Sequence, residues 1–205
     1  MTSAPPLSPG EQPRSQPESL RRILALLLGG AALIAFILLQ WDHFKEYLRY
    51  FADERTPVTL DFSTLSESWT ERTLEQRFAG NRIDCAPYQG PLRADRACAV
   101  NAGVTNGIPV LYATFFFLNG QLTQMVINIP WWVHLDAYRQ LTRSLGPPAD
   151  ARHILSHFSY LHQWRLANGA AVYFNRRRSV NPLEWNAILW RSPSDCKLKP
   201  ACFAI

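Results

Sequence analysis

An uninterrupted apolar run near the N-terminus constrains this chain more than any other feature. The run extends from Ile23 to Leu39, seventeen residues without a charged side chain, and Trp41 follows it. Seventeen residues lie at the lower limit for a helix that crosses the hydrocarbon core of a bilayer, and tryptophan is common where such a helix leaves the core. A buried helix of a soluble protein is the alternative, but few core helices are apolar on all sides. The run therefore predicts a membrane-spanning helix.

The end of the run favours a retained anchor over a cleaved signal peptide. A signal peptide ends in a small-x-small cleavage site. Here the run ends in the bulky sequence AFILLQW, and its small residues lie in the middle. We therefore expect a signal-anchor in which residues 21–55 form a helix, with 23–41 as its membrane-spanning core and the remainder as an amphipathic extension.

The basic residues around the run leave its orientation nearly balanced. Three lie on each side: Arg14, Arg21 and Arg22 before it, and Lys45, Arg49 and Arg55 after it. The adjoining Arg-Arg pair and the N-terminal amine favour a cytoplasmic N-terminus. Residues 1–20 are rich in proline and serine, which predicts a disordered cytoplasmic tail. We expect a single-pass protein of a bacterial inner membrane, with residues 56–205 as one periplasmic domain large enough to bury a core.

Four cysteines follow the anchor, which suits an oxidising compartment. They are Cys85, Cys98, Cys196 and Cys202. Proximity in sequence favours disulfides between Cys85 and Cys98 and between Cys196 and Cys202, but pairings that tie the early cysteines to the C-terminus stay open. Neither local spacing matches the Cys-x2–4-Cys pattern of zinc sites, so no metal and no cofactor are expected.

Helical periodicity occurs at three places after the anchor. The amphipathic extension, which lies on the membrane surface or docks on the domain, carries its apolar residues at i, i+3, i+4 and i+7: Phe44, Tyr47, Leu48 and Phe51. A helix at 68–80 is indicated by capping-box spacing between Ser68 and Glu71 and by Gly80 at its end. A third helix at 130–146 is expected to line one side with Trp131, Leu135, Tyr138, Leu141 and Leu145.

Strand patterns separate these helices. Residues 108–130 contain two β-rich runs joined by Asn119-Gly120, which supplies the positive φ angles of a type I′ hairpin turn. A second hairpin turns at Asn168-Gly169, short strands are expected near 82–88 and 97–102, and residues 185–190 form a last strand. Tight hairpins make neighbouring strands antiparallel. The predicted fold is α+β, an antiparallel sheet packed by two helices after one transmembrane helix.

Part of this pattern resembles a known family. A strand ending in Asn119-Gly120, an antiparallel return, and a helix that closes with LxxxLGPP at residues 141–148 together resemble envelope domains of the SmpA/OmlA type. The similar stretch is about residues 111–190, and the residues that carry it are Asn119, Gly120, Leu141, Leu145, Gly146 and Pro147. The resemblance implies the β-lactamase-inhibitor-protein-like fold and a non-catalytic module that binds other proteins. Members of that family are lipoproteins, whereas this chain has no cysteine near its anchor.

Residues suited to catalysis are present but do not form a motif. His153 and His157 have the i, i+4 spacing of a metal pair, although polar loop histidines are the alternative. His134 is expected at the edge of the apolar side of its helix. Four acidic residues offer a carboxylate pair: Asp84, Asp95, Asp136 and Glu184. No Gly-x-Ser-x-Gly or glycine-rich phosphate loop occurs. The sequence therefore favours a non-enzymatic protein; an envelope enzyme acting on lipid or glycan through His134 or the histidines within 153–162 is the alternative.

Two groups of residues are candidates for contact with a partner. Arg176, Arg177 and Arg178 are expected at the end of a hairpin strand, either as a solvated edge or as an anion site for lipid headgroups or an acidic protein. Trp131 and Trp132 offer an aromatic contact surface.

The formal charge of +5 gives no argument for nucleic acid. The sequence predicts a membrane-anchored protein-binding module, an accessory subunit of an envelope or secretion assembly or an immunity-type protein, with the bilayer and another envelope protein as partners.

Overall fold

The computed structural model of the chain describes residues 18–52, 55–151 and 161–198. The chain divides into two compact units, residues 1–41 and 42–205. Residues 1–17 of the predicted tail lie outside the described residues, as do His153, His157 and Cys202.

The first unit consists of α1 (Glu18–Leu39). Its stretch from Leu20 to Leu39 is long and apolar enough to cross a membrane, a property that a signal sequence near an N-terminus shares. The leucine side chains of α1 are exposed, as at Leu26 (76%) and Leu39 (83%). One continuous helix over 21–55 was predicted, and this is wrong in one respect: α1 ends at Leu39 and a separate helix, α2 (Trp41–Ala52), follows.

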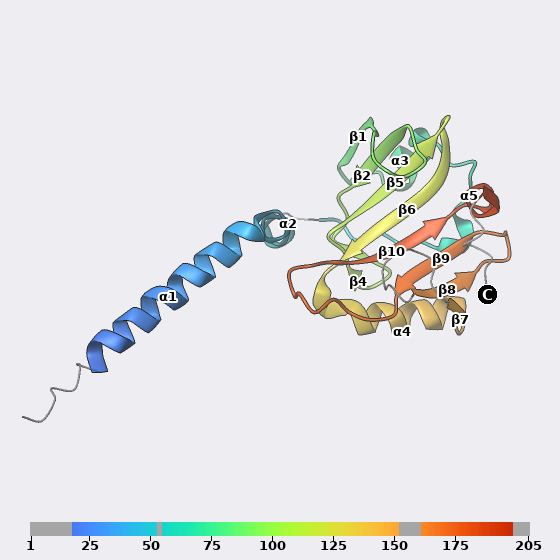
Figure 1. Cartoon of the computed structure of the whole chain (residues 1–205). Helices are drawn as coiled ribbons and strands as arrows, with labels where there is room; N and C mark the ends of the chain where they lie inside the picture. The colour runs from blue at the N-terminus through green and yellow to red at the C-terminus, as the bar shows by residue number, and fades with distance from the viewer. Residues whose placement is uncertain (1–17, 53–54, 152–160, 199–205) are drawn as a thin grey trace, which may run out of the picture. The chain divides into compact units, whose positions relative to one another are not determined.

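The second unit is built on an antiparallel sheet. In the described part of the chain it has eight strands in the order β1-β2-β5-β6-β10-β9-β8-β7, and every neighbouring pair is antiparallel (Figure 1). The strands are β1 (Ile83–Pro87), β2 (Arg96–Val100), β5 (Tyr112–Leu118), β6 (Gln121–Ile129), β7 (Ala149–Ala151), β8 (Leu161–Arg165), β9 (Ala171–Asn175) and β10 (Asn186–Arg191). A small ribbon pairs β3 (Val104–Thr105) with β4 (Ile108–Pro109). The α+β class is confirmed.

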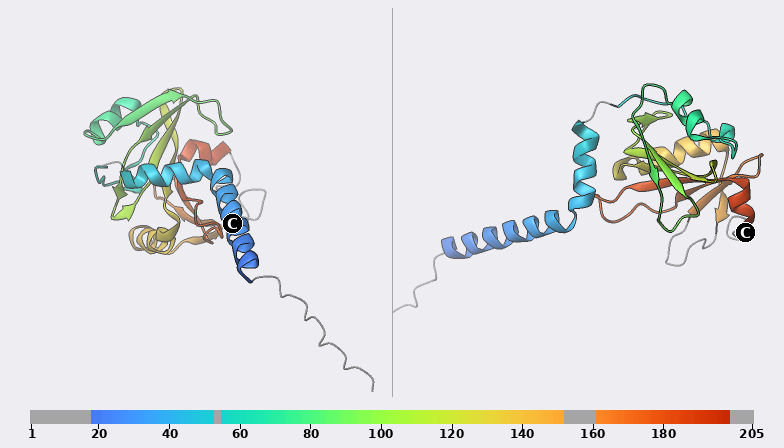
Figure 2. Two further views of the ribbon diagram at one scale, coloured as in Figure 1. Left: turned by 90° about the vertical axis from the view of Figure 1, so that its left-hand side faces the viewer. Right: turned by 90° about the horizontal axis from the view of Figure 1, so that it is seen from above.

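Two helices cover one face of this sheet, as predicted. They are α3 (Glu71–Arg77) and α4 (His134–Leu145), which lie on the same side of the strands (Figure 2). The 3-10 turn η1 (Phe62–Thr64) packs into the same core. The core joins Leu74, Phe78, Ala137 and Leu141 to strand residues Phe115, Phe117, Ile127, Val172, Phe174 and Ile188. The short helix α5 (Pro193–Leu198) packs against the other face, where Cys196 contacts a smaller cluster around Tyr173.

The β5–β6 hairpin confirms the interpretation of its turn dipeptide. Asn119 has φ 52° and Gly120 has φ 75°, the two positive angles that a type I′ turn requires. The β8–β9 connection differs. Gly169 has φ 84°, and β8 ends at Arg165 while β9 begins at Ala171, so this is a longer loop rather than a two-residue turn.

The N-terminal cap predicted for the helix at 68–80 is wrong. α3 begins at Glu71, and its capping box joins the side chain and backbone of Thr70 with those of Thr73. Ser68 instead hydrogen bonds to the hydroxyl of Ser66. A hydroxyl residue at 66, 68 or 70 is equally suited to cap by type, and the capping residue in the structure is Thr70, which follows the buried Trp69.

The apolar side predicted for the helix at 130–146 is also wrong at Leu135, which is 59% exposed. Residues Trp131–Val133 form a 3-10 turn, η2, before α4 begins. Because a 3-10 turn has 3.0 residues instead of 3.6, it changes the phase of the residues that follow. The buried residues of α4 are therefore His134, Ala137 and Leu141.

One of the two predicted disulfides is present. Cys85 and Cys98 lie opposite each other in the β1–β2 register and are bonded. The bond fixes β1, an edge strand, to its neighbour. Cys196 is buried in α5, and because Cys202 lies outside the described residues, their pairing stays a prediction.

Candidate functional site

Helix α2 docks on the sheet domain through aromatic side chains. The Trp131 backbone N–H donates to the Tyr47 hydroxyl at 3.1 Å, and the Tyr47 ring lies 5.4 Å from that of Trp132. The His43 ring packs edge-on against Trp185 at 4.7 Å. Tyr47 is buried, and desolvation raises the pKa of its phenol, an effect that the Trp131 N–H partly offsets. Of the two positions left open for the amphipathic extension, docking on the domain is thus observed.

Trp131 contacts the loop that carries the three arginines. Its indole Nε1–H donates to the Ser179 carbonyl at 2.6 Å, and the Arg178 guanidinium lies 3.6 Å above the ring. The Ser179 hydroxyl in turn donates to Glu184 and accepts from the Asn181 backbone N–H. A cation over an indole face is attracted by the ring quadrupole. The loop after β9 is therefore held by the contacts of Trp131 with Arg178 and Ser179 and by the bond between Ser179 and Glu184.

The structure brings the five predicted partner-binding residues onto one part of the domain. Arg176–Arg178 follow the end of β9, as expected, and all three are exposed. Trp132 is 46% exposed beside the half-buried Trp131. We call Trp131, Trp132 and Arg176–Arg178 the arginine–tryptophan surface. It lies on the side of the domain that carries α2 and the β9–β10 connection (Figure 1).

His134 lies beneath this surface, in the core. It is 4% exposed and its ring stacks on Phe174 at 4.7 Å, so the expectation of a boundary position is wrong. Burial lowers the pKa of its imidazole, and the Arg178 charge lowers it too, while hydrogen bonds with Asn186 and the Arg176 backbone act in the opposite direction. His162 is half-buried, packed on Tyr138 at 4.6 Å. Neither position resembles an accessible general base.

The four acidic candidates are not brought together. Asp84 pairs with Arg82 at 2.9 Å, and Asp136 pairs with Arg139 at 3.3 Å on α4. Asp95 accepts from the backbone N–H of Asn119 at 2.8 Å, next to the β5–β6 turn, and Glu184 binds Ser179. Each carboxylate has its own structural partner on a different element. The arrangement required for a carboxylate pair is therefore not formed by these residues.

The described residues contain one three-member cluster of metal-ligand types, Glu71 with Cys85 and Cys98. The two sulfur atoms are bonded to each other, and Glu71 forms an ion pair with Arg96 at 2.5 Å. A disulfide offers no thiolate to a metal. This cluster is a structural element of the β1–β2 edge.

An open pocket of about 510 Å³ lies between α2 and the β1–β2–β5 side of the sheet. Sequence reasoning did not single out its residues, because they come from α2, the segment after it and three strands: Glu46, Arg49, Arg55, Arg82, Asp84, Ala99, Val100, Asn101, Leu111 and Tyr112. Three arginines face two carboxylates, and Arg49 and Arg82 form ion pairs with Glu46 and Asp84. Desolvation raises the pKa of the Tyr112 phenol, and the Glu46 charge adds to it. The pocket carries a small excess of positive charge.

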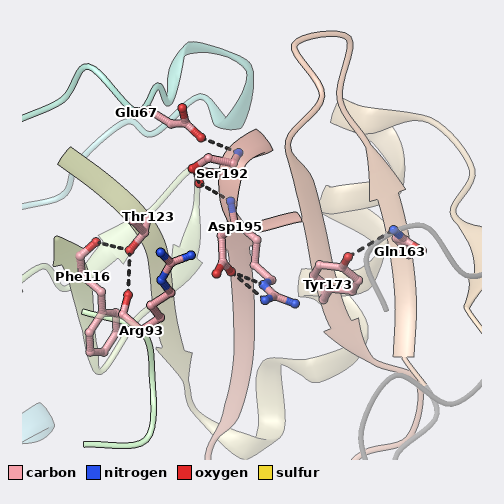
Figure 3. A network of polar contacts seen from close by, with 10 residues as sticks. Glu67, Arg93, Phe116, Thr123, Gln163, Tyr173, Ser192 and Asp195 are labelled. Carbon is pink, nitrogen blue, oxygen red and sulfur yellow. Dashed lines mark hydrogen bonds and ion pairs between the residues drawn. The ribbon is translucent and has the colours of Figure 1, made fainter. Parts of the chain in front are cut away.

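A polar network joins α5 to the C-terminal end of β10 (Figure 3). The Arg191 Nε–H donates to the Asp195 carboxylate at 2.6 Å, and both residues are buried. The Ser192 hydroxyl accepts from the Asp195 backbone N–H, and Glu67 accepts from that of Ser194. The buried guanidinium of Arg191 and the buried carboxylate of Asp195 neutralise each other, as a buried ion pair requires. This network is part of the fold rather than a reactive site.

Comparison of the chain with protein-family models, curated proteins and solved structures found no match. The resemblance to SmpA/OmlA-type domains is therefore untested, and function is argued below from geometry.

Proposed function

We propose that this chain is a membrane-anchored protein-binding module whose sheet domain faces the periplasm of a bacterium. α1 is the anchor, and the arginine–tryptophan surface is the binding site. One observation carries the proposal: Trp131 braces a loop that presents three exposed arginines next to the exposed ring of Trp132. Arginine and tryptophan are the residue types that contribute most to protein–protein contacts.

The contacts of Trp131 with this loop favour binding, because an ordered loop loses less conformational entropy when a partner binds. A free loop loses conformational entropy when it binds. Here the Ser179 carbonyl and the Arg178 guanidinium already contact Trp131, so Arg176 and Arg177 are presented from a fixed backbone. Planar guanidinium groups recognise carboxylates through paired hydrogen bonds. The proposed partner is therefore a protein with an acidic contact surface, as in an envelope or secretion assembly or in a toxin that an immunity-type protein captures.

The disulfide of the domain supports the proposed location in the periplasm, which is an oxidising compartment. Cys85–Cys98 fixes an edge strand, and such bonds persist outside the cytosol. The enzyme alternative has less support, because His134 is buried and is not among the residues that line the pocket.

Charge reversal in the full chain tests the proposal. The chain is solubilised from its native membrane in mild detergent and recovered with its neighbours by affinity tag. We expect an acidic envelope protein to co-purify with the wild type and to be lost from the Arg176→Glu/Arg177→Glu variant. A matched control, Arg143→Glu/Arg165→Glu, makes the same charge change at exposed residues of α4 and β8 and should retain the partner.

Two results would contradict the proposal. One is equal loss of the partner from both charge-reversed variants. The other is recovery of the chain alone, together with loss of the cellular phenotype in His134→Ala at unchanged protein level, which would favour the enzyme.

A further inference from the structure

Helix α2 has a second apolar side that the domain covers only in part. Phe44, Leu48 and Phe51 follow one another at offsets 0, 4 and 7 and form what we call the outer stripe, in which Phe44 is half-buried and Phe51 contacts Trp132. Leu48 is 49% exposed and Phe51 is 71% exposed, whereas Tyr47, on the docked side, is 6% exposed. By helical periodicity the outer stripe lies roughly 100° around the axis from the docked residues His43, Tyr47 and Tyr50. α2 therefore docks through one stripe and presents another.

Chain connectivity restricts what can cover the outer stripe. Gln40 is the only residue between α1 and α2. Consecutive Cα atoms are 3.8 Å apart, so α2 begins within about 8 Å of the end of α1, whatever the angle between the two units. If α1 spans the bilayer, α2 begins at the membrane surface. An apolar helical side at that depth lies within reach of the boundary between headgroups and acyl chains.

The polar side of α2 is suited to the same position. Asp42 forms an ion pair with Lys45 at 2.6 Å, and Glu46 forms one with Arg49 at 3.2 Å. These two acids and two bases balance, so charge alone would not hold the helix on an anionic surface. The apolar stripe has to supply the attraction, as in interfacial helices that bury leucine and phenylalanine side chains.

We propose that the outer stripe of α2 lies in the bilayer interface, so that α2 fixes the sheet domain to the membrane surface. The occupant of the stripe is lipid, and the domain is held through Tyr47 and its contacts with Trp131 and Trp132. Phe51 stacks on Trp132 with an interplanar angle of 14°, so the same helix places the arginine–tryptophan surface beside the bilayer. The partner that binds there is consequently itself a membrane-embedded or membrane-anchored protein.

This inference rests on the anchoring proposed for α1, and the experiment separates the two. The photoreactive residue benzoylphenylalanine replaces Leu33 in α1, Leu48, Phe51 or Ala167 in separate full-length chains. Each chain is reconstituted into vesicles of phosphatidylethanolamine and phosphatidylglycerol, irradiated, and examined by mass spectrometry for lipid adducts. Ala167 is an exposed control in the β8–β9 loop, on the side of the domain away from α2 (Figure 1).

We expect lipid adducts at positions 33, 48 and 51 with yields at least tenfold above that at 167. Two positions in the stripe are labelled so that the result does not depend on a local structural change caused by one substitution. Adducts at 33 with yields at 48 and 51 equal to the control would overturn the interfacial position while leaving the anchor intact. Absence of lipid adducts at 33 would overturn the anchor, and the inference with it. A protein adduct in place of lipid at position 51 in intact cells would assign the stripe to a protein partner and also refute the inference.

Discussion

At the scale of single residues, His134 holds a neutral imidazole inside the core, and its protonation opposes folding. Burial lowers its pKa in the folded chain below the ordinary value of 6.5, and the Arg178 charge lowers it further. The unfolded chain therefore binds a proton at His134 at a higher pH than the folded chain does. The contribution of His134 to stability is complete above about pH 6.5 and is lost as the pH falls from there toward the folded-state pKa.

Urea unfolding of the full chain in detergent between pH 8 and pH 5 measures this dependence. The wild type should lose unfolding free energy below about pH 6.5, and His134→Gln should show a flatter profile over the same range. Ala167→Gln is the control, because this exposed position carries no titratable side chain, and its profile should follow the wild type. A His134→Gln profile as steep as the wild type would show that another group is responsible.

The contact between Arg178 and Trp131 makes a second prediction at this scale. A cation over an indole contributes about 0.5–1 kcal/mol at an exposed site. Arg178→Ala should lower the unfolding free energy by that amount, and Arg178→Lys by less, since an ammonium keeps the charge but not the planar stacking. A double-mutant cycle with Trp131→Leu checks the pair. A coupling energy of zero would mean that the observed geometry does not brace the loop.

At the scale of elements, the sequence correctly predicted features that depend on residues close together in the chain. Asn119-Gly120 allows the positive φ angles of its hairpin, and Gly146 caps α4 with φ 83°. The predicted stop at Gly80 is less accurate, because α3 ends at Arg77 with Phe78 as its C-cap. These signals act within a few residues, so they can be read from the chain alone.

Features that depend on distant residues were not predicted. The 3-10 turn before α4 contains Trp131, which donates to the distant Ser179 carbonyl, and this turn changes which residues of the helix are buried. Residue types predicted the members of the arginine–tryptophan surface, but the contact that joins its two halves connects η2 with the β9–β10 connection. The pocket draws on five segments. Such assemblies depend on strand order, which hydrophobic periodicity does not specify.

The prediction at this scale concerns the stability that the disulfide gives to the β1–β2 edge. The Cys85–Cys98 bond closes a loop with a sequence separation of 13, for which the loop-entropy relation gives about 3 kcal/mol. A Cys85→Ala/Cys98→Ala variant should lose about that much unfolding free energy, and amide exchange should accelerate first in β1. Strands β9 and β10, on the other half of the sheet, are the internal control. Unchanged exchange in β1 would mean that pairing with β2 alone holds this edge.

At the scale of the whole molecule, α2 is the element through which the chain passes from the first unit to the sheet domain. It follows α1 after one residue, and it is fixed to the sheet domain through Tyr47. Under the proposals above, the membrane supplies part of the specificity, because only partners at the bilayer reach the arginine–tryptophan surface.

The orientation of the anchor is the last prediction, and the basic residues around α1 determine it. Arg14, Arg21 and Arg22 precede the apolar run and three basic residues follow it, so the Arg21-Arg22 pair beside the run decides the balance.

Alkaline phosphatase, active only outside the cytoplasm, is fused to the C-terminus of the full chain. The wild-type fusion should be active, and Arg21→Gln/Arg22→Gln should lose most of the activity because part of the population inverts. Lys45→Gln/Arg49→Gln removes two charges from the other side and should remain active. An inactive wild-type fusion at normal expression would place the domain in the cytoplasm, where the Cys85–Cys98 bond would not persist.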